Sequence, residues 1–149
     1  MRRRGFTFVE LLTVILVLSI LASVAVAKYL DLKHRALAAN AAEDMHSVRY
    51  AAYSAAHTNG EWPAETGAGA VPPEMKPHLG EGVVFSRPDY TLDWENLGTG
   101  GGGIQIGVTV TAKNDRLRHA LVQLIGNKGP FLAVGNQVTL IIVGPDGES

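Results

Sequence analysis

Gly5-Phe6-Thr7-Phe8-Val9-Glu10 decides the fold, because it opens a long apolar run and places one carboxylate inside that run. Arg2, Arg3 and Arg4 precede it, and Glu10 is the one charged residue among the 22 residues from Phe6 to Ala27. A helix of that length spans roughly 33 Å, which is enough to cross the hydrocarbon core of a bilayer. The sequence therefore predicts a membrane-spanning helix over residues 6–27.

Glu10 is unusual in such a setting. An ionised carboxylate costs about 2.5–3.5 kcal/mol at the centre of a bilayer, and less near its surface. Acids in spanning segments therefore normally have a partner, and they mark functional sites. We expect Glu10 to be such a residue.

The short basic leader Met1–Gly5, followed by Phe6-Thr7-Phe8-Val9-Glu10-Leu11-Leu12, resembles the type III signal of type IV pilins and type II secretion pseudopilins. This resemblance implies that a prepilin peptidase cuts between Gly5 and Phe6 and methylates the new amino terminus of Phe6. Glu10 then occupies the fifth position of the mature chain, where this family carries its assembly glutamate.

The same resemblance implies a domain organisation. Residues 1–5 are the leader peptide, residues 6–27 are the transmembrane and filament-core half of the N-terminal helix, and residues 28–149 are a pilin-like globular head that includes the helix's amphipathic half. The implied protein is a structural subunit of a type IV pilus-like or type II secretion pseudopilus filament, and not an enzyme.

The implied partners are further copies of the chain, other pilins or pseudopilins, the prepilin peptidase and an inner-membrane assembly platform. Before assembly, the subunit would span the inner membrane once with its head in the periplasm. Afterwards it would lie in a periplasmic or cell-surface filament.

A conventional secretory signal is the alternative. It would use the three arginines as its basic region, Leu11–Val24 as its apolar region and Ala25-Val26-Ala27 as its cleavage site. A periplasmic binding or enzymatic module would then begin at Lys28. An uncleaved single-span anchor, oriented by the cytoplasmic arginines, is a third possibility. Glu10, and a helical pattern that continues past Ala27, favour the pilin-like interpretation.

Beyond the apolar run, the pattern predicts that the helix continues to about Thr58. Asn59-Gly60 supplies a stop, and no proline occurs before Pro63. Helical spacing gives one apolar stripe, which we expect to face the core beneath a sheet; it comprises Leu30, Leu37, Ala41, Met45, Val48, Ala52 and Ala56.

The rest of the chain predicts an irregular loop and a sheet. Glu61–Gly82 is the loop, with Trp62 over the core of the head. Alternating residues predict strands at Asp89–Trp94 and Ile104–Thr111, and a last strand at Gln137–Val143. Between them, Asn114 or Asp115 can cap a short helix that carries Leu117, Ala120, Leu121, Leu124 and Ile125 and ends at Gly126. The fold class is therefore α+β: a long N-terminal helix packed against a small antiparallel sheet.

Charge and composition exclude several function classes. Without the leader, ten Lys and Arg face 14 Asp and Glu, so the mature side chains sum to −4 and a nucleic-acid surface is not indicated. The chain has no cysteine and therefore no disulfide. His34, His46, His57, His78 and His119 form no metal-ligand spacing.

Other constellations carry no defined chemistry. Gly98–Gly103 matches a nucleotide-binding glycine pattern, but a strand follows it where a helix is needed, so a turn is favoured. No catalytic, cofactor or metal site is predicted. Asp89, Asp93 and Glu95 are expected to meet at a strand end. Asp146 and Glu148 are the only acids of the tail, where major pseudopilins bind calcium. The basic patch Lys113, Arg116, Arg118 and His119 is expected to be a solvated face, or else a contact with DNA or a neighbouring subunit.

Overall fold

The computed structural model describes residues 6–98, 106–126 and 129–143. The elements follow the order α1 (Phe8–Asn59), β1 (Tyr90–Asn96), β2 (Ile106–Ala112), α2 (Asp115–Ile125), β3 (Phe131–Val134) and β4 (Gln137–Val143). A short 3-10 turn, Lys76–His78, lies between α1 and β1. The chain divides into two compact units, one ending at Lys33 and one beginning at His34. We call the second the head unit.

In the N-terminal unit, the apolar side chains of α1 are exposed. Every residue from Phe6 to Tyr29 is exposed, and Phe8, Leu16 and Val24 are each exposed over 61–74% of their surface. An 18-residue window of α1 has a mean hydropathy of 2.6, and none of it is buried. The helix is thus long and apolar enough to cross a membrane, a property that a secretory signal shares.

In the head unit, α1 presents small side chains to the core. Four residues of the predicted stripe (Ala41, Met45, Val48 and Ala52) are at most 1% exposed. Leu37 and Ala56 are only half-buried, whereas Ala38, Ala51 and Ala55, which the stripe omitted, are fully enclosed. The buried face is therefore wider than a one-residue stripe, because alanine leaves room for neighbouring elements to approach the helix closely.

Helix α1 ends where the sequence predicts. The last helical residue is Asn59, and Gly60 has a φ of +79° that favours glycine. The Gly60 N–H donates to the Ala56 carbonyl at 2.8 Å and so satisfies one of the last carbonyls of the helix.

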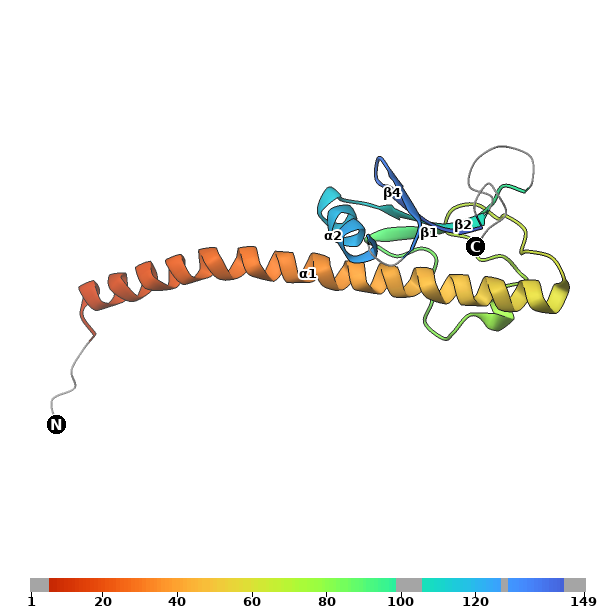
Figure 1. The fold of residues 1–149 in the computed structure, drawn as a ribbon. Helices are drawn as coiled ribbons and strands as arrows, with labels where there is room; N and C mark the ends of the chain where they lie inside the picture. Colours follow the sequence, from red (N-terminus) through yellow and green to blue (C-terminus); the bar gives the residue numbers. More distant parts are fainter. Residues whose placement is uncertain (1–5, 99–105, 127–128, 144–149) are drawn as a thin grey trace. The chain divides into compact units, whose positions relative to one another are not determined.

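The head unit has one four-stranded antiparallel sheet with the order β1-β2-β4-β3. Figure 1 shows α2 and the sheet on the same side of the C-terminal part of α1. One sheet face carries the core, with Leu92, Trp94, Val108, Val110 and Leu140 at most 2% exposed. Helix α2 adds Leu117, Leu121 and Ile125 to the same cluster. The predicted α+β, pilin-like architecture is confirmed.

The predicted strands and short helix are present with small shifts. Strand β1 extends to Asn96, and β2 is described from Ile106, since residues 104–105 lie outside the described ranges. Asn114 caps α2, because its side-chain oxygen accepts the Leu117 N–H at 2.8 Å. Leu124 is 36% exposed, so only part of the predicted apolar face is buried.

Strand β3 was not predicted. It pairs with β4 across Gly135-Asn136, a two-residue turn in which Gly135 has a φ of +58°. Leu132 and Val134 are 47% and 62% exposed, so this edge strand lacks the alternating burial that makes a strand visible in a sequence. The Gly135-Asn136 pair was the sequence signal that could have predicted a hairpin here.

The opposite edge of the sheet is covered by the chain itself. The Leu92 N–H of β1 donates to the Phe85 carbonyl at 2.7 Å, and the Leu92 carbonyl accepts the Gly69 N–H at 2.8 Å. Both backbone groups therefore have partners in the loop, and β1 offers no free edge at this point.

Trp62 lies over the core, as predicted. Its ring is 5.2 Å from the ring of Tyr53 and 6.4 Å from that of Trp94, measured between centroids. The next residue is also held, because the Pro63 carbonyl accepts the Trp94 Nε1–H at 3.0 Å and the Asn96 amide at 2.7 Å. These contacts attach the exit of α1 to the first strand.

Candidate functional site

The acid of the apolar run forms a reciprocal pair with Thr7 at the start of α1. Glu10 Oε2 accepts the Thr7 N–H at 2.8 Å and the Thr7 hydroxyl at 2.8 Å. In return, Thr7 Oγ1 accepts the Glu10 N–H at 3.3 Å. This geometry is a capping box, in which two unpaired helix N–H groups are satisfied by side chains three residues apart.

The capping box adds a second role for Glu10 that sequence reasoning missed. The spacing Thr-x-x-Glu before an apolar run was the sequence pattern that could have predicted the capping box. Glu10 therefore has polar partners within its own chain. Glu10 and Phe6 are both exposed, and Phe6 is exposed over 73% of its surface. Gly5, which precedes the predicted cleavage site, lies outside the described residues.

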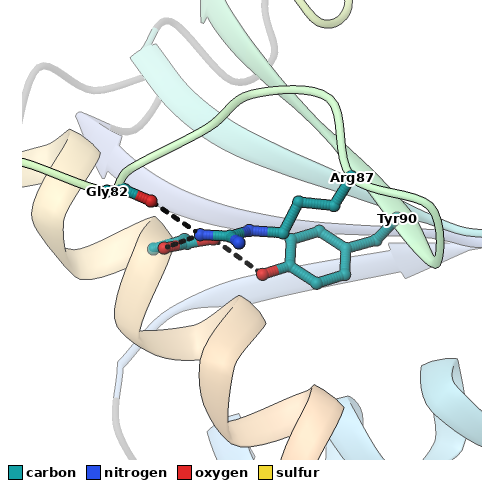
Figure 2. Close-up of polar contacts among 4 residues, drawn as sticks. Gly82, Arg87 and Tyr90 are labelled. Carbon is teal, nitrogen blue, oxygen red and sulfur yellow. Dashed lines mark hydrogen bonds and ion pairs between the residues drawn. The ribbon is translucent and has the colours of Figure 1, made fainter.

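A second polar cluster, which the sequence did not predict, lies inside the head unit (Figure 2). Asp44 belongs to the buried face of α1 and is 7% exposed. Its Oδ2 accepts Arg87 Nε–H at 2.8 Å and the Tyr90 hydroxyl at 2.6 Å, while Oδ1 accepts Arg87 Nη2–H at 3.3 Å. Arg87 Nη2 also donates to the Gly82 carbonyl at 2.9 Å. We call Asp44, Arg87 and Tyr90 the head clamp.

The head clamp holds one charge pair and one neutral donor. The hydrogen bond to Asp44 raises the pKa of Arg87, so the guanidinium stays cationic. Burial, and then the hydrogen bond to Asp44, raise the pKa of Tyr90, so its phenol stays protonated and donates. The buried carboxylate is thus compensated, and the segment from Gly82 to Tyr90 is fixed to α1.

A signal for the head clamp was present in the sequence. Asp44 follows Ala41 by three residues and precedes Val48 by four, so a charge stands on the apolar face of the helix. A buried acid of this kind requires a cationic or donor partner. Which partner it has depends on how the loop before β1 folds back, and residue spacing does not reveal that.

Three carboxylates form what we call the acidic strip: Glu65, Asp93 and Glu95. Asp93 and Glu95 alternate with buried residues of β1 and point to the sheet face away from the core. Burial, then the charges of Glu95 and Glu65, raise the pKa of Asp93 to about 6, although a bond from the Trp94 N–H opposes this. The prediction that Asp89, Asp93 and Glu95 meet is wrong for Asp89; Glu65 is instead the third carboxylate beside Asp93 and Glu95. Asp89 lies at the other end of β1, where its carbonyl accepts the Lys113 N–H at 3.0 Å.

The predicted basic patch is divided. Arg116 and His119 are exposed on α2, whereas Arg118 is half-buried. Lys113 precedes the helix and donates its Nζ–H to the Arg87 carbonyl at 3.3 Å. Only Arg116 and His119 therefore form an outward basic face on α2.

The described parts of the chain contain no group of three His, Cys, Asp or Glu side chains that can hold a metal ion. Residues 99–103 of the glycine-rich stretch, and the tail acids Asp146 and Glu148, lie outside the described ranges.

Comparison with known proteins adds one finding. Residues 1–26 match the family model of the prokaryotic N-terminal methylation motif. The chain carries a pilin-type N-terminal signal. This signal supports a pilin-type protein that is processed by a prepilin peptidase, in a family that is structural rather than catalytic. The signal and the exposed apolar helix also fit membrane anchoring. The search of curated proteins and that of solved structures each gave no match.

Removing the cation of the head clamp should destabilise the head unit. Arg87→Met leaves the Asp44 carboxylate buried without its charge partner, which costs about 3 kcal/mol. Breaking a buried ion pair costs roughly 3–5 kcal/mol of folding stability, and we expect the lower value here because the Arg87 side chain is 34% exposed. Urea unfolding of the full chain in detergent, followed by the fluorescence of its two tryptophans, reports on the head unit. Arg116→Met is the matched control and should change stability by less than about 0.5 kcal/mol. Equal losses in the two variants would contradict a special role for the head clamp.

The acidic strip should make head stability depend on pH. The pKa of Asp93 is about 6 when folded against an ordinary value of 3.8, so the folded state binds the extra proton and stability falls as pH rises through that interval. Asp93→Asn should therefore stabilise the head at pH 7 on the order of 1 kcal/mol, because partial exposure screens the repulsion. At pH 4 the two proteins should unfold alike. Thermal unfolding at both pH values measures this, with the exposed Glu81→Gln as control. A gain that is the same at pH 4 would exclude an electrostatic origin.

Proposed function

We propose that the protein is a structural subunit of a filament, either a type IV pilus-like fibre or a type II secretion pseudopilus. The observation that carries this proposal is the joint occurrence of the methylation motif over residues 1–26 and an apolar N-terminal segment of α1, residues 8–29, in which every residue is exposed. An exposed apolar helix is incompatible with water, so it requires lipid or other helices around it. A filament core supplies such helices once the subunit leaves the membrane.

In the proposed precursor, residues 1–5 are a cytoplasmic leader, residues 6–27 cross the inner membrane, and the head from residue 28 onward lies in the periplasm. The arginines of the leader agree with this orientation, because positive charge remains on the cytoplasmic side. Prepilin peptidase then cuts after Gly5 and methylates Phe6. The head fold does not require this step, since the core of the head unit is formed by residues from Ala38 onward.

Cleavage creates a cationic amine at Phe6, four residues before Glu10. In the proposed assembly step, the Glu10 carboxylate of one subunit pairs with the Phe6 amine of a neighbour. Both bonds from Thr7 end on Oε2, so Oε1 is the oxygen that we expect to accept the amine. The capping box holds the carboxylate at the helix terminus, where this contact is made.

The pairing sets the register of the subunits, and helix packing supplies most of the cohesion. An ion pair in a low-dielectric environment contributes little net stability after desolvation, but leaving one partner alone is costly. Association among apolar helices depends on close van der Waals contact along their length. The expected partners are therefore copies of this chain, other pilins and an inner-membrane platform.

Substitution of Glu10 separates its two roles. Glu10→Gln keeps a side chain that suits the capping box but removes the charge, whereas Glu10→Leu removes both. Both variants should insert into the membrane. Both should lower filament incorporation by about tenfold or more, because a tenfold change corresponds to a loss of about 1.4 kcal/mol in the free energy of association between subunits. Sheared filament protein relative to membrane-bound protein measures this. Normal incorporation of Glu10→Gln would assign Glu10 to helix capping alone.

Processing is tested at Gly5. Gly5→Ala should accumulate precursor, and the mature wild-type chain should begin at methylated Phe6 when examined by mass spectrometry. An unchanged ratio of precursor to mature protein would place the cut elsewhere. A mature chain that begins at Lys28, shorter by 22 residues, would establish the secretory-signal alternative and remove the filament proposal.

A further inference from the structure

A shallow groove lies between α1 and α2 on the head unit. It has a volume of about 200 Å³ and is lined by Arg35 from α1 and by Ala120, Gln123 and Leu124 from α2. Two of these side chains are polar donors, a guanidinium and an amide, and the other two, Ala120 and Leu124, are apolar. A groove of this composition suits a carboxylate side chain with a short aliphatic stem.

The outward face of α2 extends this donor surface. Arg116, His119 and Gln123 are all exposed, and their spacing of three and four residues places them on one side of the helix. The buried residues Leu117 and Leu121 mark the opposite side. We call the groove together with Arg116 and His119 the basic face.

The acidic strip lies on the other side of the sheet from the basic face. Helix α2 packs on the core face through Leu117 and Leu121, whereas Asp93 and Glu95 point away from that face. The two surfaces of one head therefore cannot reach each other. They are different surfaces of opposite charge, and contact between them needs a second molecule.

Resting on the proposed filament function, we infer that the basic face of one subunit binds the acidic strip of a second copy. Contact between two different surfaces is heterologous, and repetition of such a contact produces an open helical polymer when the rotation between subunits does not close a ring, which is the symmetry that a filament requires. Charge complementarity identifies a second copy as the occupant. The three clustered carboxylates repel one another, and a neighbouring guanidinium relieves this repulsion.

The raised pKa of Asp93 agrees with this contact. In the isolated head, burial and the charges of Glu95 and Glu65 oppose its ionisation. A cation from another subunit that lies beside the exposed Glu65 offsets these negative charges.

The absence of cysteine allows a direct test in the full chain. Glu95→Cys and Gln123→Cys are combined in one protein, which is expressed in cells that assemble the filament and then oxidised. We expect a reducible ladder of dimers, trimers and longer species, because each subunit offers one cysteine to each of two neighbours. Either single variant forms dimers at most. The control pair Glu95→Cys with the exposed Lys76→Cys should give no ladder.

A charge exchange provides the second measurement. Arg116→Glu should lower filament yield by about tenfold, since like charges then face each other. Adding Glu95→Arg to this variant should restore most of the yield, whereas adding the exposed Glu81→Arg should not.

The outcomes separate the two proposals. Filaments that form without a Glu95–Gln123 ladder, or with an equal ladder from the Lys76 control pair, would overturn this contact and leave the proposed function intact. Failure of Glu95→Arg to rescue Arg116→Glu better than Glu81→Arg does would also overturn it. Absence of any polymer from the wild-type chain would instead remove the proposed function, and this contact with it.

Discussion

The exposed apolar surface of α1 is the constraint on which the other features depend. From Phe6 to Tyr29 no side chain is buried, and 18 of these 24 residues are apolar. Their exposure to water would be strongly unfavourable, so this surface must be covered by lipid or by other helices. The buried face of α1 begins only at Ala38, in the head unit. The head unit has its own hydrophobic core.

Two acids on α1 show how the same chemical group is stabilised in these different settings. Glu10, in the apolar region, uses Thr7 as a local partner and is exposed to other molecules. Asp44, in the head unit, is enclosed and has Arg87 and Tyr90 as partners from a distant segment. The first arrangement leaves room for an additional cation, whereas the second is complete within the head. This contrast is why we place assembly chemistry at Glu10 and a structural role at Asp44.

Much of the fold was predictable because it follows from short-range periodicity. The continuous helix, its end at Gly60, the Asn114 cap and the strand Gln137–Val143 each depend on residues close together in the chain. Strand β3 was missed because it is short and largely exposed, so burial does not shape its sequence. The head clamp was missed for another reason: Asp44 and Arg87 are 43 residues apart, and their meeting depends on tertiary packing. At the N-terminus the motif identified Glu10, whereas its bonding to Thr7 was missed although the spacing Thr-x-x-Glu is typical of a capping box.

The two borders of the sheet differ in a way that bears on misassembly. At β1 the loop satisfies both backbone groups of Leu92, whereas β3 forms the other border and carries exposed Leu132 and Val134. Stray pairing between heads through their strands is therefore favoured at β3, whereas Leu92 of β1 has no free backbone group to offer.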